Sequence, residues 1–258
     1  MGWNLVQHSF VLLFNNLGNA FKVSVGPFLI LIAVVFGLTA TLGVSFGQFI
    51  PNPEEIPTQI APDAAGSLFI GIVLILVTAL FVFAWIAVSW HRFVLLEEYP
   101  GILPAVSGRP IWPYIGRSVM LVLVLILIAL PVGFVFGLLS GAVMNNMVLF
   151  LLLNALMGVL FTWIWLRLAL LLPATAVGKP ISMGDAWNAS GRMSGAIFQA
   201  AVILVVLNVI FSSVFGAALG DNIVAGILNL IVTWVTMMVG ISMLTTLYGH
   251  LIQGRDLN

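Results

Sequence analysis

The chain has 258 residues, of which 62% are hydrophobic and only 6% are charged, and its formal net charge is zero. Soluble domains carry about 25% charged residues, so this chain has too few charges to cover a water-facing surface, and the composition predicts a protein embedded in lipid. The balanced charge gives no sign of nucleic-acid binding, and the absence of cysteine excludes disulfides, thiolate metal sites and cysteine nucleophiles.

The first element, residues 3–21, alternates apolar and polar residues at helical spacing. Its apolar positions are Trp3, Val6, Phe10, Leu13, Leu17 and Phe21. Such a pattern predicts an amphipathic helix lying in the membrane interface; the alternative is an N-terminal extension of the first spanning helix. Residues 1–21 contain no Lys or Arg, which disfavours a cleaved signal peptide. Pro27 suits the first turn of the helix that follows.

Six apolar segments are then long enough to cross a bilayer, which takes about 20 residues. They span roughly residues 25–48, 67–92, 116–140, 146–172, 194–218 and 222–249. Barrel strands are shorter and alternate in polarity, whereas these segments are apolar all round. A helix also satisfies its own backbone groups in lipid. The predicted fold class is therefore an all-α integral membrane protein with six transmembrane helices.

The basic residues all fall on one side of this predicted topology. They are Lys22, Arg92, Arg109, Arg117, Arg167, Lys179, Arg192 and Arg255. The three loops on the other side contain acids but no Lys or Arg. The positive-inside rule places the basic side, and with it both termini, in the cytoplasm. We therefore expect a multi-pass protein of a bacterial inner membrane.

An internal repeat joins the two connections on the basic side. Residues 90–118 align without gaps to residues 165–193 with eight identities. Among them, Trp112 and Arg117 match Trp187 and Arg192. A fainter copy at 14–19 predicts three pseudo-repeated helical hairpins, with units at about 1–98, 99–173 and 174–258. The whole chain is predicted to form a single transmembrane domain.

Small residues recur at four-residue steps near the outer ends of the odd-numbered spans. The glycines of these stripes are Gly43, Gly47, Gly133, Gly137, Gly141, Gly216 and Gly220. Small residues at this spacing let helices approach closely. We expect the stripes to pack helices together within one chain; the alternative is an interface between subunits.

Aromatic and basic residues gather where the spans meet the basic side. Trp90, Trp112, Trp165 and Trp187 are predicted interfacial anchors. Arg92, Arg117, Arg167, Arg192 and His250 would lie at the level of the phosphates. One interpretation is anchoring and topology alone. The sharper hypothesis is contact with anionic lipid headgroups between the hairpins.

Residues suited to catalysis are scattered. Glu97 and Glu98 form the only acidic pair on the basic side, and adjacent residues do not share a helix face. His8, His91 and His250 lack the spacing of a metal site and are interpreted as interfacial polar residues. No catalytic, metal or cofactor-binding residue is therefore predicted, and no cofactor.

The run at 163–199 carries Arg167, Leu-Pro-Ala at 172–174, Ala186-Trp187 and Gly191, and Leu-Tyr-Gly-His-Leu follows at 247–251. These pieces resemble bacterial membrane proteins of the glycerophosphoryl diester phosphodiesterase membrane-domain group and related six-helix inner-membrane families. The catalytic part of the fused relatives is a separate soluble barrel. The resemblance therefore implies a membrane module without the enzyme.

These observations predict a non-enzymatic membrane protein: a scaffold, an accessory subunit or a lipid-associated factor. Its expected partners are membrane lipids and a further membrane protein or complex. The alternative is a transporter or channel for a lipid or a small apolar solute. A wide cavity lined by Asn154, Asn208 and threonines would favour transport, and a tightly packed centre with exposed grooves would favour the accessory role.

Overall fold

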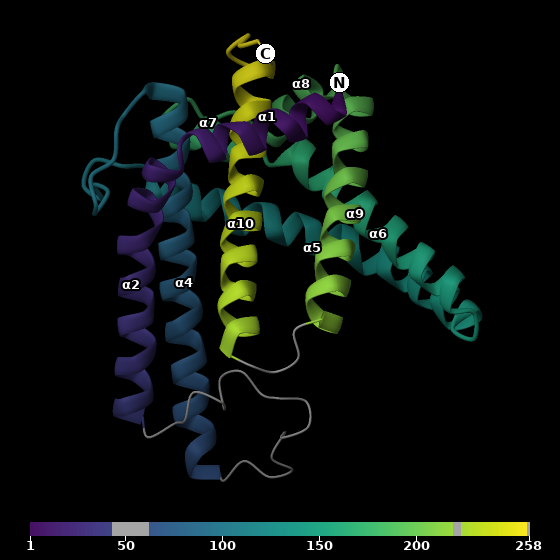
Figure 1. Cartoon of the computed structure of the whole chain (residues 1–258), viewed down its shortest axis with the longest axis horizontal. Helices are drawn as coiled ribbons and strands as arrows, with labels where there is room; N and C mark the ends of the chain where they lie inside the picture. Colours follow the sequence, from purple (N-terminus) through teal and green to yellow (C-terminus); the bar gives the residue numbers. More distant parts are fainter. Residues whose placement is uncertain (43–61, 219–222, 257–258) are drawn as a thin grey trace.

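A computed structural model describes residues 1–42, 62–218 and 223–256 (Figure 1). Within these ranges the regular structure is entirely helical, with no strand. Six helices are long and apolar enough to cross a membrane, as the sequence predicted. They are α2 (Leu17–Leu42), α4 (Pro62–Leu96), α5 (Ile111–Val143), α6 (Met147–Leu168), α9 (Ser194–Ala218) and α10 (Ile223–Leu251). Three shorter helices are α1 (Gly2–Asn15), α7 (Leu171–Ala176) and α8 (Met183–Gly191).

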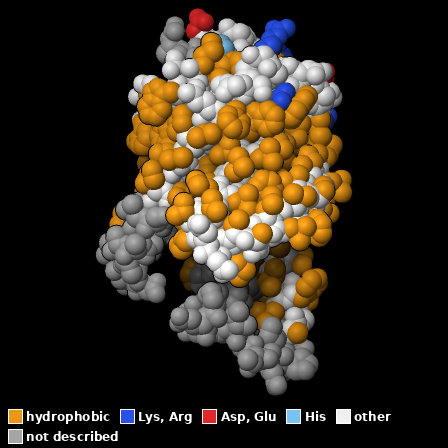
Figure 2. Space-filling model, turned by 90° about the vertical axis from the view of Figure 1, so that its right-hand side faces the viewer, with side chains coloured by type: hydrophobic (Ala, Val, Ile, Leu, Met, Phe, Trp, Pro, Cys, Tyr) orange, Lys and Arg blue, Asp and Glu red, His pale blue; other side chains and the backbone are white. Residues whose placement is uncertain are grey.

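Both termini lie at one end of the bundle, together with α1, α7 and α8 (Figure 1). We call this the basic end, because Arg92, Arg117, Arg167 and Arg192 lie in or beside the helix ends that form it. Figure 2 shows Lys and Arg side chains at this end and a broad hydrophobic surface below it. The molecule therefore has a polar end and long apolar flanks, as a membrane-spanning bundle requires.

The N-terminal region forms two helices instead of the single helix predicted over 3–21. Helix α1 ends at Asn15, Asn16 leaves the helical conformation at φ −123° and ψ 27°, and α2 begins at Leu17. The Asn16 amide nitrogen donates to the Leu12 carbonyl at 2.9 Å, which satisfies a carbonyl at the end of α1. The chain can therefore turn from α1 into α2 within one residue.

The placement of Pro27 in a first helical turn was wrong, because Pro27 lies well inside α2. A proline there removes one backbone hydrogen bond, a loss that packed neighbours can compensate in membrane helices. Pro27 is buried, and the preceding Gly26 lies so close to the loop after α4 that an added Cβ would meet the Leu103 side chain at 2.7 Å. Packing on this loop therefore accompanies the break in the α2 hydrogen-bond ladder.

Helix α1 lies across the upper parts of α9 and α10 and contacts both (Figure 1). Leu5, Val6 and Leu13 are buried on this side of α1. The backbone nitrogen of Gly2 donates to Gln199 Oε1 of α9 at 2.9 Å. Ser9 contacts α10 through the Met243 sulfur at 3.6 Å. Helix α1 thus holds together two spanning helices that otherwise pack on other neighbours.

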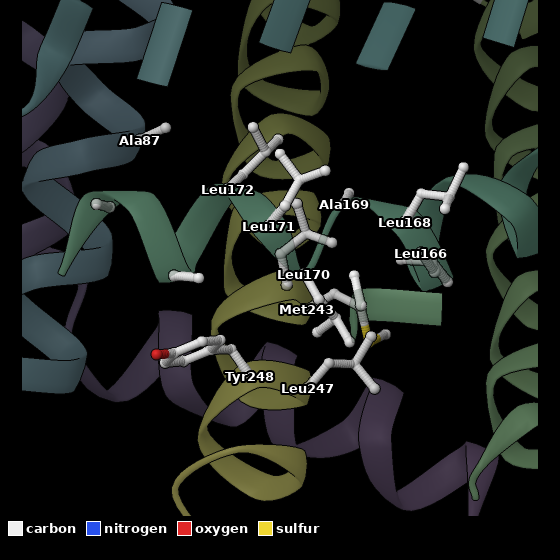
Figure 3. Packing of buried hydrophobic residues seen from close by; sticks show 14 of the residues in the cluster. Ala87, Leu166, Leu168, Ala169, Leu170, Leu171, Leu172, Met243, Leu247 and Tyr248 are labelled. Atoms are coloured by element: carbon white, nitrogen blue, oxygen red, sulfur yellow. The ribbon is translucent and has the colours of Figure 1, made fainter. Parts of the chain in front are cut away.

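The core of the protein is concentrated at the basic end. The segment predicted over 146–172 is one candidate span, Met147–Ala176, within which α6 ends at Leu168 and a short turn leads into α7. All six residues of α7 are buried. Figure 3 shows Leu170, Leu171 and Leu172 beside Met243 and Leu247 of α10. The Leu-Pro-Ala sequence therefore builds a buried crosspiece between α4, α5 and α10, which all contact α7.

The spanning helices pair unequally. Helices α2 and α4 pack together, as do α5 and α6, but α9 packs mainly on α6 and α1, and α10 on α1 and α4. The lower parts of α5 and α6 run obliquely away from the other helices (Figure 1). The threefold repeat of the sequence thus remains a prediction, and the third helix pair is arranged differently from the first two.

The expectation that the small-residue stripes pack helices within the chain was wrong for Gly137 and Gly141 of α5. Nothing described lies within 4 Å of a Cβ built on Gly137 or Gly141, and Gly133 meets only Met157, at 3.8 Å. The reason is that α5 diverges from the bundle before it reaches these residues. The remaining predicted packing glycines lie outside the residues whose surroundings the structure describes: Gly43, Gly47, Gly216 and Gly220.

Candidate functional site

The clearest polar constellation at the basic end surrounds Arg167, near the end of α6. Its guanidinium carbon lies 3.5 Å from the ring centroid of Trp187 and 5.0 Å from that of Trp163. The Arg167 Nε donates to Ser190 Oγ at 3.0 Å, and Nη2 donates to the Trp187 carbonyl at 2.8 Å. Arg167 is only 6% exposed. Cation–π contact and two charge-assisted hydrogen bonds therefore fix α8 against α6.

The stretch that binds Arg167 is positioned by the start of α8. Ser182 and Asp185 form a capping box, in which each side chain bonds the other's backbone nitrogen. This motif satisfies free N–H groups in the first turn. The hydrogen bonds from Ser182 hold the pKa of the Asp185 carboxyl below its usual value. The cap fixes where α8 begins, and within the same helix Trp187 and Ser190 meet Arg167.

The arginine at the matching repeat position, Arg92, behaves differently. It donates to Glu98 through Nε at 3.0 Å and through Nη2 at 2.6 Å, and to the Ala176 carbonyl of α7 at 2.9 Å. Arg109 also pairs with Glu98. The hydrogen bond from Arg92, with the positive charges of both arginines, lowers the pKa of Glu98. The repeated arginine therefore closes the loop after α4 and has no contact like that of Arg167 with Trp187.

His91 is fully buried, contrary to its interpretation as an interfacial residue. Its Nδ1 lies 2.8 Å from Thr245 Oγ1, and its Nε2 lies 3.4 Å from the hydroxyl of Tyr114. The Thr245 hydroxyl can donate to the Ile241 carbonyl at 2.8 Å. In that arrangement the neutral His91 ring carries its proton on Nδ1 and accepts from Tyr114 at Nε2.

The sequence offered no strong signal for this buried triad. A histidine at the end of an apolar run is compatible with a headgroup position as well as with a buried one. Only the tertiary arrangement brings α10 and α5 to the two ring nitrogens of His91. The preceding residue, Trp90, was wrongly expected to anchor at the interface. It is fully buried between residues of α1, α2 and α10, because its side of α4 faces the protein.

The other predicted site residues differ in exposure. Trp112 is 70% exposed and Trp187 is 37% exposed, whereas Trp165 is partly buried. Arg192 is exposed, and Arg117 is partly exposed with Nη1 donating to the Ile181 carbonyl at 3.3 Å. His250 is partly buried, and its Nδ1 lies 2.6 Å from the Arg255 carbonyl. Among the predicted arginines, Arg117 and Arg192 thus make the fewest hydrogen bonds and ion pairs with the residues that the structure describes.

A cleft of about 370 Å³ opens at the basic end beside α1 and α10. It is lined by His8 and Leu12 from α1, by Asn16 directly after α1, by Thr245, Thr246, Gly249 and His250 from α10, by Phe93, Val94, Leu95, Glu97 and Tyr99 at and after the end of α4, and by Arg255 and Asp256. A smaller cleft of about 210 Å³ lies against Arg92, Glu98 and Arg109. Both clefts combine charged groups with apolar walls.

Among the described residues, no three histidines or acids come together in a group that could hold a metal ion. Asn154 and Asn208, which the transport alternative would place in a cavity, are exposed on α6 and α9. The Asn154 amide nitrogen bonds the Phe150 carbonyl of its own helix at 2.8 Å. Comparison of the chain with protein-family models, with curated proteins and with solved structures finds no match.

Proposed function

We propose that this chain is a non-enzymatic, lipid-associated protein of a bacterial inner membrane with both termini in the cytoplasm. Six candidate spans support a multi-pass protein. The restriction of all basic residues to one side of the spans supports the orientation. The resemblance to membrane modules that accompany a separate phosphodiesterase agrees with a role without catalysis.

The observation that carries the proposal is the placement of exposed or partly exposed arginines and tryptophans at the basic end. Trp112 and Arg117 lie on successive turns at the start of α5. Trp187 lies in the middle of α8, and Arg192 directly follows its last residue. Indole rings favour the level of the headgroups, and guanidinium groups bind phosphate oxygens. The combination suits the headgroup of an anionic phospholipid, which presents a phosphate just outside the acyl chains.

Helix α1 supports the same role. Its buried side packs on α9 and α10, while Trp3, Val11 and Phe14 are 58%, 46% and 50% exposed. Large apolar side chains on a second side of a helix that crosses the ends of spanning helices suit contact with lipid. We therefore propose α1 as an interfacial helix that is attached to the protein on one side and to the bilayer on another.

The test is retention of anionic lipid by the double variant Arg117→Gln/Arg192→Gln. Protein extracted into mild detergent with phosphatidylglycerol and cardiolipin is measured by native mass spectrometry. We expect the double variant to retain clearly less of both lipids, while Lys179→Gln, which removes one exposed charge from the loop before α8, retains the wild-type amount. Equal retention by the double variant and the wild type would contradict the proposal. Arg92 and Arg167 are left intact because their internal contacts would confound the result.

A further inference from the structure

The cleft beside α1 and α10 contains a carboxylate at an unfavourable backbone position. Glu97 directly follows the last residue of α4 and has φ 57°, the only positive φ of a non-glycine residue in the described chain. Glycine or asparagine normally occupies this position after a helix, because other side chains crowd the backbone there. Residues in sparsely populated conformations concentrate at functional sites. Glu97, with this unusual backbone conformation, lines the cleft beside α1 and α10.

Two adjacent acids at this corner have separate environments. Glu98 is paired with Arg92 and Arg109, whereas Glu97 has no ion pair with any residue that the structure describes. The second acid of the cleft, Asp256, is likewise without a described ion pair, and both line the cleft. The cleft thus presents two carboxylates that the protein does not neutralise.

The guanidinium group of Arg255, which also lines the cleft, donates hydrogen bonds to the end of α4. Its Nη1 donates to the Val94 carbonyl at 3.0 Å and its Nη2 to the Leu95 carbonyl at 2.8 Å, both at the end of α4. Its backbone nitrogen bonds the Gly249 carbonyl at 2.9 Å. These bonds fold the C-terminal segment back against α4, where it forms one wall of the cleft. Arg255 therefore shapes the cleft, and Glu97 and Asp256 against Arg255 leave the cleft with a formal charge of about −1.

An aromatic pair completes the lining. Phe93 and Tyr99 pack edge to face with ring centroids 5.5 Å apart, and both line the cleft. Aromatic faces beside carboxylates are a recognised arrangement for alkylammonium groups. His8 of α1 and Asn16, which directly follows α1, line the same cleft. The His8 ring and the second N–H of the Asn16 amide, whose other N–H bonds the Leu12 carbonyl, suit phosphate oxygens. Leu12 and Val94 add apolar wall.

We propose that this cleft binds an alkylammonium group joined to a phosphate, and that its source is the headgroup of the zwitterionic lipid phosphatidylethanolamine. Glu97 and Asp256 receive the ammonium, with Phe93 and Tyr99 beside it, and His8 and Asn16 face the phosphate. A cleft of about 370 Å³ has the size of a small-molecule site. The inference rests on the proposed lipid association and adds a second lipid class, at a place separate from Arg117 and Arg192.

Glycine and asparagine provide unusually clean variants at position 97. Both residues favour a positive φ, so Glu97→Gly and Glu97→Asn remove the charge and relieve the backbone conformation. Each variant is expected to fold at least as well as the wild type, which separates loss of binding from loss of structure. Arg192→Gln is the matched control, because it removes a charge from the proposed anionic-lipid contact and leaves the cleft intact.

The experiment uses the full chain in lipid discs that contain equal amounts of phosphatidylethanolamine and phosphatidylglycerol. Native mass spectrometry after detergent release counts each retained lipid, and parallel discs contain N-acetylated phosphatidylethanolamine, which lacks the ammonium charge. We expect retention of phosphatidylethanolamine to fall about fivefold in both Glu97 variants and on N-acetylation, the size of one partly exposed charge contact. Retention of phosphatidylglycerol should not change in the Glu97 variants, and the reverse pattern is expected for Arg192→Gln.

Unchanged phosphatidylethanolamine retention in Glu97→Gly and Glu97→Asn would overturn the cleft assignment and leave the anionic-lipid proposal standing. Failure to retain either lipid above the level of detergent exchange would overturn both. Free phosphoethanolamine is tested by its effect on the thermal unfolding of the detergent-solubilised protein. Stabilisation by this soluble compound without retention of the lipid would show that the source is a soluble amine and overturn the lipid assignment.

Discussion

Replacement of Arg167 is the sharpest test of the packing at the basic end. The side chain makes two charge-assisted hydrogen bonds, at 3.0 Å to Ser190 and 2.8 Å to the Trp187 carbonyl, and lies 3.5 Å from the Trp187 ring centroid. Each such hydrogen bond contributes about 1.5 kcal/mol, and the close cation–π contact about 1 kcal/mol. Ordering the arginine side chain costs about 2 kcal/mol, so Arg167→Ala is expected to lower the free energy of unfolding by about 2 kcal/mol.

The measurement is reversible unfolding in mixed micelles by added dodecyl sulfate, followed by circular dichroism. Arg167→Lys should also destabilise, because an ammonium group cannot stack flat on an indole ring and reach two acceptors at once. Arg192→Ala is the control: the exposed Arg192 should change the unfolding free energy by less than about 0.5 kcal/mol. If Arg167→Ala and Arg192→Ala had equal costs, Arg167 would be solvated and the contacts between α6 and α8 would not be stabilising.

Two further predictions concern other contacts at this end. Gly26→Ala should lower the free energy of unfolding by about 1–3 kcal/mol, because the added Cβ would meet Leu103 Cδ1 at 2.7 Å and a backbone oxygen at 2.9 Å. Gly37→Ala, with open space around its Cβ, should be neutral or slightly stabilising in the same unfolding assay. Equal costs for the two variants would contradict the close packing of α2 on the loop after α4. The pKa of Glu98 is lowered in the folded protein from its ordinary 4.5. The pairing with Arg92 and Arg109 should therefore stabilise the fold fully above pH 4.5, and this stabilisation should be lost as the pH falls through the lowered folded pKa. The unfolding free energy of Glu98→Gln should depend less on pH in acid than that of the wild type, and an unchanged acid profile would contradict the pairing.

The six spans could be predicted because hydrophobic length alone decides them. Their ends were harder to predict, since polar and packed residues determine where a helix stops. Asn16 breaks the helix that the apolar spacing predicted over 3–21, and the turn before α7 interrupts a run that hydropathy treats as continuous. Pro27 shows the opposite error, since α2 continues through a residue that favours a helix start.

The side chains at the basic end were identified by type but not by direction. The repeat matched Arg92 with Arg167, yet Arg92 meets Glu98 while Arg167 meets Trp187 and Ser190. A linear pattern records that an arginine ends a helix and omits which partner the fold brings to it. The burial of Trp90 and His91 was missed for the same reason, since it depends on which side of α4 faces α1, α5 and α10.

The contact of α1 with α10 has a consequence for biosynthesis. Ser9 meets Met243, a residue 234 positions later in the chain. At a translation rate of about 5–20 residues per second, roughly 10–50 s pass between the synthesis of these two residues. During that interval Leu5, Val6 and Leu13 have no α10 to pack against. Docking of α1 on α10 is therefore one of the last contacts of the core to form.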